Sequence, residues 1–356
     1  MSQIKVLVVD DSALFRTLLR NALQDIPDCE VVGTASDGEA ALEKIVALRP
    51  DLVTLDVEMG DMNGISVLRE LKRLKVTSRV VMVSRLTSAG AQVTTDALLE
   101  GAFDFILKPF GKDPSANRAE LKMALAEKIA TIRDSFPTEH MSPIPNASKR
   151  ESQEKLKSID AVVIGSSTGG PDALSQVIPY LDPDFPVPIV IVQHMPENFT
   201  ASLAMRLNEA SEINVCEASD GLRLQPGMAV IAKGGKHLKL ERLGTSHVVT
   251  RLTGDPHEHS CRPAVDYTFR SAVDVFGGHV LAVILTGMGR DGTEGCRLVR
   301  EHSGQVIAQA AEGCVVYGMP KSVINAGQAD WVIPLPKIAN TIKTVIRSTK
   351  RANPSG

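Results

Sequence analysis

The sequence lacks the features that mark membrane, secreted and nucleic-acid-binding proteins. It has no apolar run approaching the ~20 residues of a transmembrane helix, and Met1 is followed directly by an expected strand, so we expect neither membrane insertion nor a signal peptide. The formal net charge of -3 offers no basic surface for nucleic acid or an anionic membrane. The five cysteines are odd in number, scattered and without C-x-x-C spacing. This pattern predicts reduced thiols in the cytoplasm rather than a disulfide framework or a zinc site.

The first 133 residues alternate short apolar runs with segments whose apolar side chains recur at helical spacing. Five such strand–helix units predict a doubly wound parallel sheet with the strand order 2-1-3-4-5. The expected strands are residues 4–9, 31–35, 52–55, 79–83 and 103–107, and the expected helices are residues 14–26, 38–48, 64–74, 88–100 and 115–132.

A stretch rich in serine, proline and charge, residues 134–157, separates this unit from the rest of the chain. It lacks apolar periodicity, so we expect a flexible linker. With 356 residues, the chain is long enough for a second domain with its own core, which we place at residues 158–350.

Polar side chains stand at the carboxyl ends of the strands expected in residues 1–133. Asp10 and Asp11 follow the first strand, and Asp56 ends the third, its neighbour in the expected order. Carboxylates this close repel one another unless a hard cation lies between them, and Mg²⁺ prefers such oxygen ligands. Asp56 would then be a nucleophile toward a phosphoryl group whose oxygens the metal and Lys108 neutralise. Ser84, after the fourth strand, would hydrogen-bond the new phosphate.

Residues 3–125 resemble the receiver domain of response regulators. The resemblance rests on Val9-Asp10-Asp11-Ser12, Leu55-Asp56-Val57, Met62-Asn63-Gly64, Val83-Ser84 and Lys108-Pro109. It implies a flavodoxin-like fold, phosphorylation of Asp56 by a partner histidine kinase, and an aromatic switch at Phe105. Gly60 departs from the family, which normally has proline there; we expect a looser loop without loss of phosphorylation.

The alternation of apolar runs and helical segments in residues 158–350 predicts a second doubly wound α/β unit with a mostly parallel sheet. Residues 228–232, 237–240 and 247–252, between Gly-Gly and Pro-Gly turns, are expected to form an antiparallel excursion, and Trp331 is expected in the core. The other expected strands are residues 161–164, 189–192, 213–217, 280–285, 305–308 and 329–333, and expected helices cover residues 198–210 and 263–276.

The turn after residues 161–164 fits the spacing Gly165-x-Ser167-x-Gly169, in which glycines allow a sharp turn that exposes a serine hydroxyl. A phosphate-cradling loop at a helix N-terminus and a plain small-residue turn fit this stretch equally well. Ser166 is the nearest rival nucleophile, but it does not fit the glycine spacing.

Three expected strands of the second unit end at Ser167, His194 and Asp291. Parallel strands bring their carboxyl ends together, so these side chains would meet as a nucleophile, its base and the carboxylate that orients the base. The chain order differs from that of α/β-hydrolases, which predicts a convergent triad on another sheet. Backbone N–H groups of Thr168 and Met288 would form the oxyanion hole. The histidines of residues 257–261 lack a second ligand cluster, so we expect a solvated loop rather than a metal site.

The whole of residues 160–348 resembles the catalytic domain of the chemotaxis protein-glutamate methylesterases, the CheB family. The matching motifs are Ile164-Gly-Ser-Ser-Thr-Gly-Gly170, Gln193-His-Met-Pro196, Arg262-Pro263-Ala-Val-Asp266, Leu285-Thr-Gly-Met-Gly-Arg-Asp-Gly292 and Tyr317-Gly-Met-Pro320.

The CheB resemblance implies a triad of Ser167, His194 and Asp291, with Met288 lining the site and no cofactor in the esterase. It implies hydrolysis of glutamate γ-methyl esters on methylated chemoreceptors, often with deamidation of glutamines. It further implies an unphosphorylated receiver that covers the catalytic cleft until Asp56 is phosphorylated.

The sequence lacks the signals of two other kinds of output domain. A DNA-binding or adaptor output would be expected to show a helix-turn-helix and a basic surface, and neither is found. A nucleotide-binding output would be expected to show G-x-G-x-x-G in the first turn or a lysine after it, as in a P-loop, and both are missing.

Overall fold

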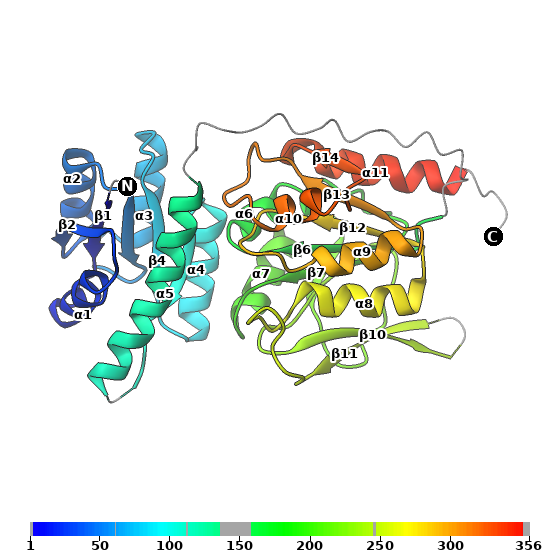
Figure 1. Ribbon diagram of the computed structural model, residues 1–356, viewed down its shortest axis with the longest axis horizontal. Coiled ribbons are helices and arrows are strands. Elements are labelled where there is room, and N and C mark those ends of the chain that lie inside the picture. Colours follow the sequence, from blue (N-terminus) through cyan, green and yellow to red (C-terminus); the bar gives the residue numbers. More distant parts are fainter. Residues whose placement is uncertain (1–2, 61, 112, 136–157, 245–246, 352–356) are drawn as a thin grey trace. The chain divides into compact units, whose positions relative to one another are not determined.

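The computed structural model describes residues 3–60, 62–111, 113–135, 158–244 and 247–351 (Figure 1). Contacts divide the chain into two compact units, Met1–Glu139 and His140–Gly356. The expected linker, residues 134–157, lies almost wholly outside the described residues. Among the described helices, none is long and apolar enough to cross a membrane.

The first unit is a five-stranded parallel sheet in the order β2-β1-β3-β4-β5, as predicted. Helix α1 packs against α5, whereas α2, α3 and α4 pack in succession, as expected when crossovers place helices on both faces of a sheet. The elements are β1 (Ile4–Val9), α1 (Ala13–Gln24), β2 (Cys29–Ala35), α2 (Gly38–Leu48), β3 (Leu52–Asp56), α3 (Gly64–Arg73), β4 (Arg79–Ser84), α4 (Ser88–Leu99), β5 (Asp104–Leu107) and α5 (Pro114–Ser135).

The second unit is built on a seven-stranded sheet in the order β14-β13-β12-β6-β7-β9-β8, and every strand pair in it is parallel. Its central strands are buried along their whole length, as expected for a sheet covered on both faces. The strands are β6 (Ala161–Ser166), β7 (Ile189–Gln193), β8 (Asn214–Glu217), β9 (Met228–Ile231), β12 (Val280–Ile284), β13 (Gln305–Gln309) and β14 (Trp331–Ile333).

Helices and one separate ribbon complete the second unit. They are α6 (Gly170–Ser175), the 3₁₀ turn η1 (Ile178–Tyr180), α7 (Phe199–Ala210), the antiparallel pair β10 (His237–Leu243) and β11 (His247–Thr253), α8 (Val265–Phe276), α9 (Thr293–Glu301), α10 (Met319–Asn325) and α11 (Leu335–Arg351). Helix α8 packs between β10 and the sheet and lies beside α9 (Figure 1).

Two expectations about the second unit were wrong. Residues 228–232 do not belong to the antiparallel excursion, because β9 pairs in parallel with both β7 and β8 and only β10 and β11 form the ribbon. Trp331 is only half-buried, since β14 is the edge strand of the sheet. Turn residues show where a strand ends, but they do not show which strand it pairs with.

The chain changes direction across the sheet at β6. From β6 it proceeds through β7 toward β8, and it later returns to place β12 on the other side of β6. The loops after β6 and β12 therefore diverge at the carboxyl edge, where open α/β sheets bind their ligands.

Candidate active site

A buried imidazole–carboxylate pair lies at this switch point. His194 follows β7, and its Nε2 is 2.8 Å from Oδ2 of Asp291, in the loop after β12. The Asp291 carboxylate also accepts the backbone N–H groups of Val265 at 2.7 Å and Asp266 at 2.8 Å. These N–H groups open α8, which no side chain of its own caps. Asp291 is thus fixed by a helix N-terminus, which favours its negative charge.

Ser167 stands in the turn between β6 and α6, beside this pair. Its backbone N–H donates to the carbonyl of Thr286 at 3.0 Å, and its carbonyl accepts Nε2 of Gln193 at 2.9 Å. Gln193 also accepts the hydroxyl of Ser166 at 2.7 Å. Ser166 is fully buried while Ser167 is half-buried, so Ser167 carries the accessible hydroxyl.

The sheet register brings Ser167 next to His194. Ser166 pairs with Gln193 across β6 and β7, and the N–H of His194 donates to the carbonyl of Ser166 at 3.1 Å. The Ser167 hydroxyl makes no hydrogen bond within the described parts of the chain. The second nitrogen of His194, Nδ1, instead lies 3.5 Å from Sγ of Cys261.

The loop of residues 257–261 was expected to be solvated, and His257, His259 and Ser260 are indeed exposed, but two of its side chains also contact the site. His259 Nε2 is 2.8 Å from Oδ2 of Asp266, and Cys261 faces His194. The loop packs against the site because α8 begins directly after it and brings Asp266 underneath. Sequence reasoning missed Asp266, His259 and Cys261; the closeness of all three to the helix start at Val265 was the available signal.

His259, Asp266 and Asp291 also place one potential ligand atom each within 4.8 Å of one another. Asp291 Oδ1 already accepts the N–H groups of Asp266 and Gly292, and Asp266 Oδ1 accepts that of Gly295 at 2.6 Å. These carboxylates therefore act as caps for the starts of α8 and α9, a role that leaves them poorly suited to hold a metal.

Burial and hydrogen bonds within the site shift the pKa values of His194, Asp291 and Asp266. Burial opposes the charged form of His194, but the hydrogen bond with Asp291 and the contact with Cys261 outweigh it and raise the pKa of His194 to about 9. Burial would raise the pKa of Asp291, yet the hydrogen bonds from His194 and α8 hold it below its usual range. Burial, followed by the charge of Asp291, raises the pKa of Asp266.

Of the two residues expected to supply oxyanion donors, Thr168 follows Ser167 in the same turn and Met288 lies in the loop after β12. Thr168 is buried, and its carbonyl accepts the hydroxyl of Thr286 at 3.0 Å. Met288 is 36% exposed and lies in the Gly-rich loop after β12. That loop packs closely on the serine, since a Cβ at Gly287 would lie 2.8 Å from the Cβ of Ser167.

The first unit gathers its predicted residues at the carboxyl edge of its own sheet. Nζ of Lys108 is 2.7 Å from Oδ2 of both Asp10 and Asp56, and all three side chains are buried. Burial raises the pKa of Asp56 to about 6, although the Lys108 hydrogen bond lowers it. Asp10, Asp11 and Asp56 offer carboxylate oxygens within 4.8 Å of one another, a donor set that fits Mg²⁺.

The two remaining residues of the first site lie on β4 and β5. The Ser84 hydroxyl accepts from Oγ1 of Thr94 at 2.7 Å and donates toward the carbonyl of Gly90 at 3.3 Å, both in α4. Phe105 is half-buried on β5.

Comparison with known proteins decides the family. Residues 162–342 match the model of the CheB methylesterase family, and residues 6–120 match that of the response regulator receiver domain. The chain belongs to the CheB methylesterase family. It is accordingly a response regulator with a carboxylic ester hydrolase domain that acts in chemotaxis.

Relatives of the CheB methylesterase family cover nearly the whole chain. A protein-glutamate methylesterase/protein-glutamine glutaminase of Desulfotalea psychrophila is 46% identical over 98% of this chain and 100% of its own. One of Thermotoga maritima is 46% identical over 94% of this chain and 96% of its own. The crystal structure of the Thermotoga maritima CheB methylesterase catalytic domain is 49% identical, with a TM-score of 0.51, over 53% of this chain and 98% of that domain.

Proposed function

We propose that this chain hydrolyses glutamate γ-methyl esters on chemoreceptors through Ser167, His194 and Asp291. The observation that carries the proposal is the buried His194–Asp291 pair beside the accessible hydroxyl of Ser167. Its relatives are named protein-glutamate methylesterase/protein-glutamine glutaminase, so deamidation of receptor glutamines belongs to the same proposal.

The proposed reaction begins with attack of Ser167 Oγ on the ester carbonyl. Because Nε2 of His194 is held by Asp291, the proton of the hydroxyl passes to Nδ1. His194 then gives this proton to the departing methanol, which leaves a glutamyl ester on Ser167. Water, deprotonated by the same nitrogen, cleaves that ester and frees the glutamate and Ser167. Asp291 keeps the ring oriented and stabilises the imidazolium.

Negative charge forms on the carbonyl oxygen in each tetrahedral intermediate. In this proposal the backbone N–H groups of Thr168 and Met288 stabilise it. The packing of the loop after β12 onto the Ser167 turn supports this assignment, since it brings both residues close to the serine.

Phosphorylation of Asp56 by a chemotaxis histidine kinase would activate the esterase. Receiver domains use Mg²⁺ for this step, and here Asp10, Asp11 and Asp56 would hold the ion, which would neutralise phosphoryl oxygens. Lys108 already contacts Asp56 and would follow the new phosphoryl group. Ser84 and Phe105 would then change position, with the Ser84 hydroxyl exchanging Thr94 for a phosphate oxygen.

Methanol release from methylated receptor membranes tests the proposed reaction. Ser167→Ala should reduce release by at least ~10³-fold, because a catalytic triad acts as a unit. The matched control is Cys261→Ala, which removes the thiol that contacts His194 and should retain activity. Loss in Cys261→Ala with retention in Ser167→Ala would make the thiol the nucleophile. No release by the unaltered protein, with a phosphodonor and Mg²⁺ present, would refute the proposed substrate.

A further inference from the structure

Two exposed cations lie on the Met288 side of the catalytic serine. Arg290 stands between Met288 and Asp291 in the loop after β12, and Lys321 lies in the first turn of α10. Both residues are exposed, and neither side chain makes a hydrogen bond or ion pair with another described residue. Together, Arg290 and Lys321 form a cationic rim of the site.

The packing of the loop after β12 keeps this rim close to the serine. The carbonyl of Gly287 accepts the N–H groups of Gly318 at 3.1 Å and Met319 at 2.8 Å, which joins the start of α10 to the loop. A Cβ at Gly318 would lie 3.2 Å from Cα of Met288, and one at Gly287 would lie 2.8 Å from Cβ of Ser167. The start of α10, the loop and the serine turn are thus in direct contact.

The two segments that carry the rim supply no free carboxylate for it. In residues 285–292 Asp291 is the one acidic residue, and it is buried and occupied by His194 and the start of α8. Helix α10 contains no acidic residue. Exposed cations without a local partner are available to a negatively charged group of another molecule.

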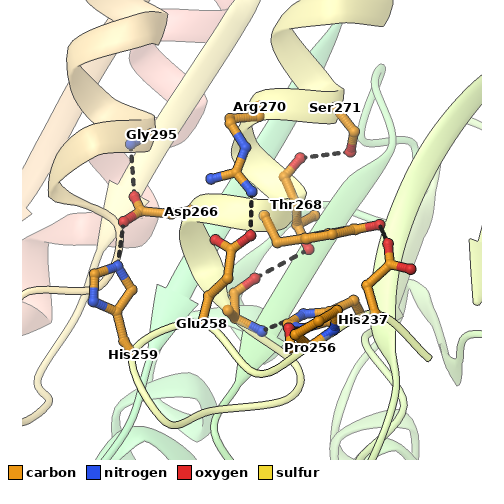
Figure 2. Close-up of polar contacts among 12 residues, drawn as sticks. His237, Pro256, Glu258, His259, Asp266, Thr268, Arg270, Ser271 and Gly295 are labelled. Carbon is orange, nitrogen blue, oxygen red and sulfur yellow. Dashed lines mark hydrogen bonds and ion pairs between the residues drawn. The ribbon is translucent and has the colours of Figure 1, made fainter. Parts of the chain in front are cut away.

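Other cations around the site are engaged or lie farther along its edge. Figure 2 shows Arg270 paired with Glu258, which occupies its guanidinium group. Arg262 donates to two backbone carbonyls of its own loop, each at 3.1 Å. Lys236 is exposed, but its Nζ lies where the β10–β11 ribbon ends. The cationic rim differs from these groups because it is unpaired and belongs to segments that contact the serine turn.

The chemistry of the proposed reaction indicates what the rim binds. Hydrolysis of a γ-methyl ester, like deamidation of a glutamine, converts a neutral side chain into a carboxylate, so each turnover adds a negative charge to the receptor surface. We propose that Arg290 and Lys321 are specificity-determining residues, which bind glutamate carboxylates that flank the ester on the receptor. The inference rests on the proposed function and extends it to recognition of the substrate.

The size of the effect follows from the exposure of the rim. Exposed ion pairs are weak, so each cation should strengthen binding by up to about fivefold at low ionic strength. Salt screens charges that solvent surrounds, and at ~1 M salt the Debye length is only about 3 Å, so most of this gain should then be lost. Because the rim acts in binding and not in the chemical step, its removal should raise KM and leave kcat nearly unchanged.

Sedimentation of the full-length protein with receptor membranes tests the rim without using the reaction. The membranes carry receptors with glutamate at the modified positions, and a phosphodonor and Mg²⁺ are present. At low salt, Arg290→Gln/Lys321→Gln should bind roughly tenfold more weakly than the unaltered protein. Arg290→Lys/Lys321→Arg keeps both charges and should bind like the unaltered protein. Membranes whose receptors carry glutamine at these positions should show a smaller difference.

Lys343→Gln/Arg347→Gln is the matched control. It removes the same two charges from α11, where Lys343 and Arg347 lie 3.3 and 2.9 Å from the carboxylate of Asp182, in the segment that precedes β7. These residues are near the amino ends of the strands, away from the site, so binding should be unaltered.

The KM for methanol release should rise in Arg290→Gln/Lys321→Gln and not in the control. Equal binding by this variant and the unaltered protein, an equal loss in the control, or a loss that persists at high salt would overturn the proposal. Absence of binding by the unaltered protein would overturn it too. Absence of methanol release by all proteins, with the expected difference in binding still present, would instead overturn the proposed reaction and leave the role of the rim intact.

Discussion

At the scale of single residues, buried carboxylates in both units are paired with a hydrogen-bond donor from a lysine or a histidine. Lys108 lies between Asp10 and Asp56, and His194 lies against Asp291, so each buried carboxylate has a donor within 2.8 Å. Removing one partner of such a group leaves an uncompensated charge, which costs several kcal/mol, whereas the intact group has a modest net effect on stability.

The raised pKa of His194 makes the reaction depend on pH. A base must be neutral to accept the proton of Ser167, and below a pKa of about 9 the neutral fraction falls tenfold per pH unit. We expect kcat/KM for methanol release to rise with pH between 7 and 9 and then level off. Cys261→Ala should move this rise to lower pH, because Cys261 contributes to the raised pKa. A rate independent of pH between 7 and 9 would contradict the assignment of His194 as the base.

At the scale of elements, helix α8 links the core to the site. Its first N–H groups hold Asp291, its residue Asp266 caps α9, and Val265 packs onto β6. The position of the catalytic carboxylate therefore depends on how closely α8 approaches the sheet.

Gly165→Ala should disturb this approach. A Cβ at Gly165 would lie 2.5 Å from Cγ1 of Val265 and 3.1 Å from Cδ1 of Ile284, so the helix must shift. Overpacking of this kind costs about 1–3 kcal/mol and should lower the melting temperature of the second unit by several degrees. Methanol release should fall as well, since the N–H of Val265 holds Asp291.

Gly254→Ala is the matched control for Gly165→Ala. An added Cβ there would meet only Nζ of Lys236, at 3.9 Å, so calorimetry should give an unchanged melting temperature. Equal melting temperatures for the two variants would mean that the packing of α8 on β6 can relax to accept the added methyl group, and would contradict the prediction.

On the scale of the whole molecule, the two units each carry a separate site on a separate sheet. The relatives of the CheB methylesterase family span both units, so the pairing of receiver and esterase is a property of the family. We propose that phosphorylation of Asp56 in the first unit activates the esterase in the second.

Asp56→Asn should separate basal activity from its regulation. The amide keeps the shape of Asp56 beside Lys108 but cannot accept a phosphoryl group. We expect unaltered basal methanol release and no stimulation by a small phosphodonor with Mg²⁺, whereas the unaltered protein should be stimulated. Chelation of Mg²⁺ should abolish the stimulation in the latter. Stimulation of Asp56→Asn by the phosphodonor would mean that the activation acts elsewhere.

Much of this molecule was predictable from local sequence. Continuous apolar runs such as Val280–Ile284 predict buried parallel strands, because only a strand covered on both faces accepts apolar side chains at every position. Polar residues that end such runs, including Asp10, Asp56, Ser167 and His194, are predicted at the carboxyl edge of a sheet, because the carboxyl ends of parallel strands meet there. The first sheet followed the expected order throughout.

Strand order in the second sheet and the surroundings of its site were decided only by tertiary structure. β9 joined the parallel sheet, and the exposed loop of His259 and Cys261 brought these two side chains against Asp266 and His194. Both outcomes depend on contacts between segments far apart in the chain. Periodicity and turn residues depend only on residues adjacent in the sequence. The burial of a residue, the capping of α8 by Asp291 and the raised pKa of His194 depend instead on contacts with residues far away in the sequence.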